Sequence, residues 1–144
     1  MSAEVEGRVF IDTNILVYAY DRTAGEKRRI AAQLVEECWQ KENGCLSVQV
    51  LQELYVALTQ KIAQPLDRQI ARQLVADLAF WRVHAPDASD VLRAIDLQQS
   101  QSLSFWDAML LNSAAQMGCQ RLYSEDLSHG QMYGGVQVVN PFRE

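Results

Sequence analysis

Four acidic residues occupy positions beside apolar segments, where acids are not the default choice. Asp12 directly follows the apolar run at residues 9–11, and Asp126 follows a second apolar run at residues 121–124. Glu53 borders the apolar stripe of one predicted helix, and Asp107 lies in the first turn of another that is apolar nearly all round. Taken singly, each has an ordinary explanation: a turn, a loop, an exposed surface or a capping box. Their combination is what suggests chemistry.

Carboxylates that converge in one crevice repel each other, because close like charges raise their pKa values. A divalent cation removes this conflict. Mg²⁺ and Mn²⁺ are hard ions that prefer oxygen ligands. One or two such ions activate a water molecule and stabilise the in-line transition state of phosphodiester cleavage. If the four acids converge, they therefore favour a site for a divalent cation, and such a site can support cleavage of phosphodiester bonds.

The apolar patterning predicts the elements that bring these acids together. Short strands are expected at residues 9–11, 45–48, 81–84, 121–124 and 136–139, and helices at residues 25–43, 51–62, 67–78, 87–100 and 104–118. The run at residues 15–18 fits either a strand or a helix. Strands that alternate with helices indicate an α/β fold, with a mainly parallel sheet of about five strands covered on both faces. Residues just past the carboxyl ends of such strands face a common crevice.

Composition narrows the class of protein. The chain has 144 residues, enough for one domain, and 13 basic against 18 acidic residues give a net charge of −5. Such a balance argues against non-specific coating of nucleic acid, but not against a nuclease whose acids hold a cation. No apolar run reaches the roughly 18 residues of a membrane span, and residues 1–10 do not resemble a secretory signal. Three widely spaced cysteines favour a reducing, cytoplasmic setting.

At these residues the sequence resembles the PIN-domain family, and within it the VapC toxins, the ribonuclease partners of bacterial toxin–antitoxin pairs. The matching segments span almost the whole chain in the family's order. They are FIDTNILVYAYD, LQEL, SFWDAML, LYSEDLSHGQ and VVNPF. The first and third segments are specific in combination, whereas a lone DTN would be weak.

The resemblance implies a single three-layer α/β/α domain over residues 1–144 and Mg²⁺- or Mn²⁺-dependent endoribonuclease activity. It assigns the catalytic metal ligands to Asp12, Glu53, Asp107 and Asp126. It also implies that Asn14 and Ser124 shape the site through hydrogen bonds to a carboxylate or water. Family members commonly form homodimers and bind a small antitoxin whose basic tail occupies the acidic crevice. Glu125 is expected to point away from the ligands.

Three other functions remain open at this stage. A haloacid-dehalogenase-type phosphatase also begins with a strand that ends in Asp, but it usually needs a second Asp where this chain has Asn14. A non-catalytic module that binds RNA or protein would be favoured by a missing acid, and none is missing. A nuclease with a processing role outside a toxin pair would keep the same chemistry. The RNA target cannot be read from the sequence.

Other residues that carry chemistry elsewhere have plainer explanations here. His84 and His129 have no cysteine nearby in sequence and are not expected to act as ligands or bases. The basic run at residues 27–29 is typical of a solvated helix face. Trp39, Trp81 and Trp106 are expected in the core or at an interface.

Overall fold

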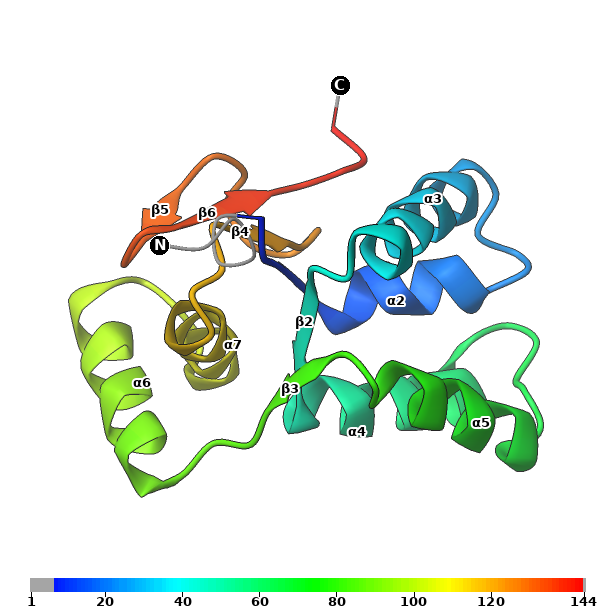
Figure 1. Ribbon diagram of the computed structural model, residues 1–144, viewed down its shortest axis with the longest axis horizontal. Helices are drawn as coiled ribbons and strands as arrows, with labels where there is room; N and C mark the ends of the chain where they lie inside the picture. Colours follow the sequence, from blue (N-terminus) through cyan, green and yellow to red (C-terminus); the bar gives the residue numbers. More distant parts are fainter. Residues whose placement is uncertain (1–6, 144) are drawn as a thin grey trace.

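The computed structural model describes residues 7–143, which form a central sheet flanked by helices (Figure 1). The strands are β1 (Val9–Ile11), β2 (Gly44–Ser47), β3 (Arg82–His84), β4 (Arg121–Tyr123), β5 (Met132–Tyr133) and β6 (Val136–Val139). They lie in the order β3-β2-β1-β4-β6-β5, and every neighbouring pair is parallel except β5 and β6. The mainly parallel sheet is therefore confirmed. It has six strands where about five were predicted.

The additional strand is β5, which the sequence pattern did not indicate because it is only two residues long. It pairs antiparallel with β6 through the tight turn at Gly134 and Gly135. Both glycines have positive φ angles, 53° and 86°, a conformation that glycine adopts at little cost.

The helices form the outer layers of the fold. They are α2 (Thr13–Tyr20), α3 (Glu26–Lys41), α4 (Val48–Val56), α5 (Arg68–Leu78), α6 (Ala88–Ser100) and α7 (Phe105–Gln116). Helix α7 contacts β2, β4 and β6, and α6 packs against it. Helix α3 contacts β2 and packs against α2, on the other side of the sheet from α6 and α7 in Figure 1. This arrangement confirms the three-layer α/β/α architecture.

Side-chain caps fix where several helices begin. Asp67 and Ser104 cap α5 and α7 as their sequence positions predict, and Asp87 closes a capping box with Asp90 at the start of α6. Asp12 caps α2, so the ambiguous run at residues 15–18 is helical.

One predicted helix is wrong in its last turn. The pattern at residues 51–62 predicts a continuous α-helix, but α4 gives way at Ala57–Lys61 to a π-helical turn, η1. The Ile62 N–H bonds to the Ala57 carbonyl, five residues back, at 3.1 Å. Apolar spacing over one turn does not distinguish these two geometries. The π-turn changes the direction of every side chain that follows it, including Lys61.

The core follows from the strand sequences. All three residues of β1 are buried, as expected for the central strand of a sheet covered on both faces. Cys38, Cys45 and Cys119 are buried free thiols, in keeping with the prediction of no disulfide framework. None of the helices in residues 7–143 combines the length and the apolarity that a membrane crossing requires. The expectation about a secretory signal concerns residues 1–10, and residues 1–6 lie outside the described part of the chain.

Candidate active site

The four predicted acids come from separate elements and line one cleft. Asp12 follows β1, Glu53 lies on α4 after β2, and Asp126 lies just beyond β4, so three of them rise from the carboxyl ends of parallel neighbours. Asp107 enters from the first turn of α7. The cleft has a volume of about 430 Å³. Its lining comprises Asp12, Thr13, Asn14, Gln49, Gln52, Glu53, Val56, Ala57, Lys61, Trp106, Asp107, Leu110 and Asp126.

Asp12 is the buried member of the group, with only 6% of its surface exposed. Its carboxylate accepts hydrogen bonds from the Thr13 N–H at 2.7 Å and from the Ser124 hydroxyl at 2.8 Å. The pKa of Asp12 is nevertheless raised to about 6, chiefly by burial and with a smaller contribution from the negative charges of Asp126 and Glu53, which together outweigh the two hydrogen bonds. The folded chain thus holds this carboxylate in a place where a positive charge would stabilise it.

Asn14 and Ser124 connect Asp126 to the rest of the site. The Asn14 amide donates to the Asp126 carboxylate at 2.9 Å, and its carbonyl accepts from the Glu125 N–H at 3.4 Å. The Ser124 hydroxyl, which donates to Asp12, accepts from the Asp126 N–H at 3.2 Å. One buried hydroxyl therefore holds two acids in a fixed relation.

Glu53 is held by residues that the sequence did not single out. Thr13 donates to its carboxylate at 3.3 Å, and Gln49 donates from one helical turn earlier at 3.4 Å. The spacing of Gln49 and Glu53, four residues apart on one helix, is a signal that sequence reasoning could have used. The role of Thr13 depends on how α2 and α4 meet, which the sequence does not reveal.

Asp107 is half-buried at the start of α7. Its N–H donates to the Ser104 hydroxyl at 3.1 Å, which fixes the first helical turn. The preceding residue, Trp106, also lines the cleft and is 62% exposed. Trp106 was expected in the core or at an interface, and its exposure excludes the core: α7 is buried from Ala108 to Ala114, but its first turn opens onto the cleft.

The donor set suits a hard divalent cation, since all four acids offer carboxylate oxygens to one cleft. Within residues 7–143, no three Asp, Glu, His or Cys side chains lie close enough to hold an ion jointly. Mg²⁺ commonly takes only one or two protein carboxylates and completes its shell with water and substrate oxygens. The residues present therefore fit such an ion.

Glu125 and the two histidines lie outside this group, as expected. The Glu125 carboxylate accepts a hydrogen bond from Tyr18 at 2.5 Å and pairs with Lys27, so it points away from the cleft. The His84 ring forms a hydrogen bond with the Ser113 hydroxyl at 2.8 Å, and its other nitrogen lies 3.3 Å from the Asp90 carboxylate. The His129 ring accepts from the Asn140 N–H at 3.0 Å. None of the three lines the cleft.

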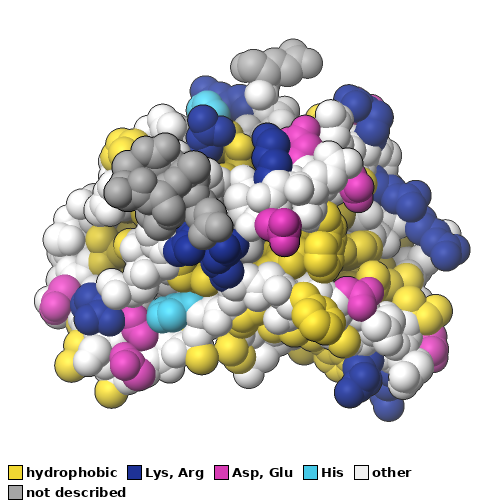
Figure 2. Space-filling view, in the orientation of Figure 1, with side chains coloured by type: hydrophobic (Ala, Val, Ile, Leu, Met, Phe, Trp, Pro, Cys, Tyr) yellow, Lys and Arg dark blue, Asp and Glu magenta, His cyan; other side chains and the backbone are white. Residues whose placement is uncertain are grey.

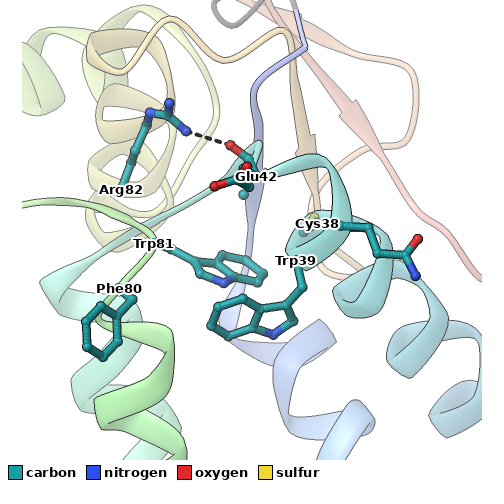
Figure 3. Close-up of a pocket in the computed structure, with 8 residues that line it drawn as sticks. Cys38, Trp39, Glu42, Phe80, Trp81 and Arg82 are labelled. Carbon is teal, nitrogen blue, oxygen red and sulfur yellow. Dashed lines mark hydrogen bonds between the residues drawn. The ribbon is translucent and has the colours of Figure 1, made fainter.

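A larger cavity of about 630 Å³ lies at the opposite, amino ends of β2 and β3. Figure 3 shows Trp39 and Trp81 side by side in it, with their ring centres 5.4 Å apart, and Arg82 bonded to the Glu42 backbone. A Cβ atom at Gly44 would lie 2.4 Å from the Trp81 ring, so this aromatic packing requires glycine. The cavity gathers no set of acids and is not a candidate for metal chemistry.

The basic side chains form no continuous stripe on the face seen in Figure 2, where they occur in several small groups. Lys61 is the one Lys or Arg among the described residues that line the acidic cleft. This face therefore lacks the basic stripe that favours non-specific binding of nucleic acid.

The chain is similar to several solved structures, including the following three. A toxin–antitoxin complex from Klebsiella pneumoniae gives a TM-score of 0.68 at 22% identity, with 94% of this chain and 99% of that chain covered. The sarcin–ricin loop cleaving toxin VapC20 of Mycobacterium tuberculosis gives 0.60 at 18% identity, covering 82% and 89%. FitAB bound to a DNA fragment gives 0.69 at 14% identity, covering 94% and 96%. At these identities the likeness establishes the fold alone.

No curated protein sequence matches the chain significantly. A family model, described as the PIN domain, matches residues 9–134. That match covers most of the chain, and we conclude that the chain belongs to the PIN-domain family.

Proposed function

We propose that this chain, as one PIN domain over residues 1–144, is a Mg²⁺- or Mn²⁺-dependent endoribonuclease that acts as the toxin of a toxin–antitoxin pair. One observation carries the proposal: four carboxylates from four separate segments line a single cleft at the carboxyl edge of the parallel sheet. Asp12 is buried beside two other acids, and both effects raise its pKa. An acid with a purely structural role would not need to lie near like charges.

In this proposal the candidate ligands are Asp12, Glu53, Asp107 and Asp126, of which any one ion binds one or two directly and completes its shell with water and RNA oxygens. When bound, the ion lowers the pKa of a water molecule and stabilises charge at the scissile phosphate. The protein's part is orientation. Thr13 positions Glu53, Asn14 positions Asp126, and the other hydrogen bonds of the site are already formed in the folded chain. Pre-formed ligands lose little entropy when the ion and the RNA bind.

The toxin role is supported by what the similar structures are. Two of them are described as a toxin–antitoxin complex and as a sarcin–ricin loop cleaving toxin. By analogy, a small antitoxin partner, a homodimer and a cytoplasmic location are parts of the proposal. A basic antitoxin segment would meet complementary charge in the acidic cleft.

The direct test is incubation of the purified chain with a defined pool of RNA, with and without Mg²⁺, followed by mapping of the cut ends. We expect cleavage that EDTA stops and Mg²⁺ or Mn²⁺ restores. Asp12→Asn should abolish cleavage while the protein remains folded by circular dichroism. The matched control is Asp96→Asn, at an exposed aspartate of α6 outside the cleft, and it should cleave like the wild type. Cleavage in EDTA would overturn the proposal.

A bacterial growth assay distinguishes a toxin role from a processing role. Expression of the active chain should slow bacterial growth, and co-expression of a small neighbouring gene should restore it. Harmless expression of a chain that cleaves RNA in vitro would contradict the toxin role and leave the nuclease assignment standing.

A further inference from the structure

Two residues that line the acidic cleft have side chains suited to contacts with nucleic acid and not with a cation. They are Trp106, on the first turn of α7, and Lys61, at the end of the π-turn. Both are exposed, and both side chains reach the cleft from elements that also carry or follow a proposed ligand. Because both side chains are exposed at the cleft, packing in the core does not explain their position.

Trp106 is the most exposed tryptophan of the chain, at 62% against 39% for Trp39. Its ring meets Phe105 edge to face, with ring centres 5.0 Å apart, so it is braced on one side and open on the other. It immediately precedes Asp107 in a turn that Ser104 caps, so its backbone is fixed about 3.8 Å from that of a proposed ligand. An exposed, braced indole beside catalytic acids is suited to stacking on a planar group.

Lys61 supplies the positive charge that the cleft otherwise lacks. It is exposed, and none of the ion pairs in the described part of the chain involves it. The π-turn at Ala57–Lys61 places it there, and single π-turns in other proteins often occur at functional sites. An ammonium group at the rim of an acidic cleft offers a contact for the phosphate of an approaching nucleic acid.

We propose that Trp106 and Lys61 form an RNA-binding subsite, in which an unpaired base stacks on Trp106 and a backbone phosphate contacts Lys61. This inference rests on the proposed nuclease function and assigns two residues by which the cleft would hold its RNA. Bases inside an A-form duplex are stacked on each other and cannot reach an indole ring, whereas unpaired bases can be splayed onto aromatic side chains. The cleft volume of about 430 Å³ is within the range of small-ligand sites.

The test measures binding of a labelled, mixed-sequence 12-nucleotide RNA by fluorescence anisotropy, single-stranded and as a duplex with its complement. An Asp12→Asn background prevents cleavage during the measurement. Trp106→Ala should weaken binding of the single strand about 5- to 150-fold, the range measured for loss of one base–aromatic stack, and leave the weaker duplex binding unchanged. Trp106→Phe should recover part of the affinity.

Lys61 is tested by salt dependence, which a purely structural residue would not alter. Lys61→Ala should reduce the slope of log affinity against log salt by about 0.7, the value for one phosphate contact in a single strand. Lys61→Arg should restore the slope, and Trp106→Ala should leave it unchanged.

Matched controls come from the opposite end of the sheet. Phe80→Ala removes an 86% exposed aromatic at the rim of the aromatic cavity (Figure 3), and Lys41→Ala removes an exposed lysine at the end of α3. Both should bind RNA like the parent protein. If Trp106→Ala matches Phe80→Ala while the wild type still cleaves RNA, the subsite is wrong and the nuclease function stands.

Two further outcomes are equally decisive. If Trp106→Ala leaves RNA affinity unchanged and alters the oligomeric state in analytical ultracentrifugation, Trp106 belongs to a protein interface and the subsite is overturned. If the wild type cleaves no RNA with Mg²⁺ or Mn²⁺, the proposed function itself fails.

Discussion

Two buried aspartates, Asp12 and Asp90, have the same side chain in different surroundings: Asp12 lines the proposed catalytic cleft, and Asp90 lies in a hydrogen-bonded network between helices. They are 6% and 3% exposed, and both lie at the beginning of a helix. The pKa of Asp12 is raised to about 6, chiefly by burial and in smaller part by two neighbouring carboxylates. The pKa of Asp90 is held far below its usual range, chiefly by the hydrogen bond from the Asp87 N–H, with further help from surrounding side chains.

The difference lies in the partners that each carboxylate meets. Asp90 accepts hydrogen bonds from the Asp87 N–H at 2.9 Å, from Asn112 at 2.9 Å and from Arg93 at 2.8 Å, and His84 lies 3.3 Å away. This region joins β3, α6 and α7 and leaves the charge fully satisfied. Asp12 has two donors and faces two acids. A bound cation would stabilise this buried carboxylate, as the proposed function requires.

The largest expected effect is on catalysis by a cleft acid. Asp107→Asn should reduce RNA cleavage more than about 100-fold, because it removes charge where the transition state needs it. The melting temperature should stay close to that of the wild type, since the Ser104 cap is made by the Asp107 backbone and is kept. Single-turnover cleavage measures the expected loss of activity, and thermal denaturation measures the melting temperature. Asp96→Asn serves as the control, and equal activity of both variants would contradict the assignment of Asp107.

For the free energy of unfolding, we expect the larger effect at Asp90 and not at the cleft acid Asp12. Asp90→Asn should lower the free energy of unfolding by about 2–3 kcal/mol, because an amide cannot accept from all the donors that surround Asp90 and leaves buried groups unpaired. Asp12→Asn should leave stability unchanged or raise it, since asparagine is also a good helix cap and the repulsion is gone. Urea denaturation in EDTA measures both variants. A loss in Asp12→Asn as large as that in Asp90→Asn would break the comparison.

The two aspartates should also differ in the pH dependence of stability. The pKa of Asp90 is lower in the folded chain than in the unfolded chain, where Asp has a pKa of about 3.9. Its contribution is present above that pH and is lost as the pH falls toward its folded pKa. The pKa of Asp12 is raised, so its contribution is present below about pH 3.9 and is lost as the pH rises through about 6.

Urea denaturation in EDTA at pH values from 3 to 7 tests these opposite signs. The stability gap between wild type and Asp90→Asn should narrow below about pH 4. Between pH 4 and 7, the wild type should lose stability relative to Asp12→Asn. Parallel pH curves for all three proteins would contradict the proposed difference.

A smaller effect is expected at Ser124, which bonds Asp12 and Asp126 without being a ligand itself. Ser124→Ala should weaken Mg²⁺ affinity or activity about 10-fold, the lower end of the range for residues that orient metal ligands. Ser124→Thr, which keeps the hydroxyl, should recover most of it. Ser128→Ala, at an exposed serine of the same loop, is the control. Calorimetric titration with Mg²⁺ would show no difference between the two alanine variants if Ser124 only fills space.

Much of the fold could be predicted because local signals agreed with the global arrangement. The apolar run of β1, the Asp67 and Ser104 caps, and Gly118, whose φ of 73° is typical of a residue that ends a helix, are all readable from short segments. Strand β5 and the π-turn could not be predicted, since two residues carry no periodicity and one inserted residue leaves the apolar pattern nearly unchanged.

The sequence allowed the acids of the candidate site to be proposed, but not the other residues that line the cleft. Asp12 and Asp126 follow parallel strands, so the topology brings them to one edge whatever the details. The exposure of Trp106 and the reach of Lys61 depend on where a helix turn opens and how a π-turn directs a side chain. Such properties arise from packing between distant segments, which a single sequence does not display.

The most direct test of the shared cation site is a crystal structure grown with Mn²⁺ and measured at the manganese absorption edge. We expect an anomalous peak in the cleft, with carboxylate oxygens of Asp12 and at least one other of the four acids within about 2.0–2.3 Å. The peak should vanish in Asp12→Asn crystals grown in the same conditions. Manganese bound elsewhere on the chain, or a cleft that stays free of metal at millimolar Mn²⁺, would contradict the account.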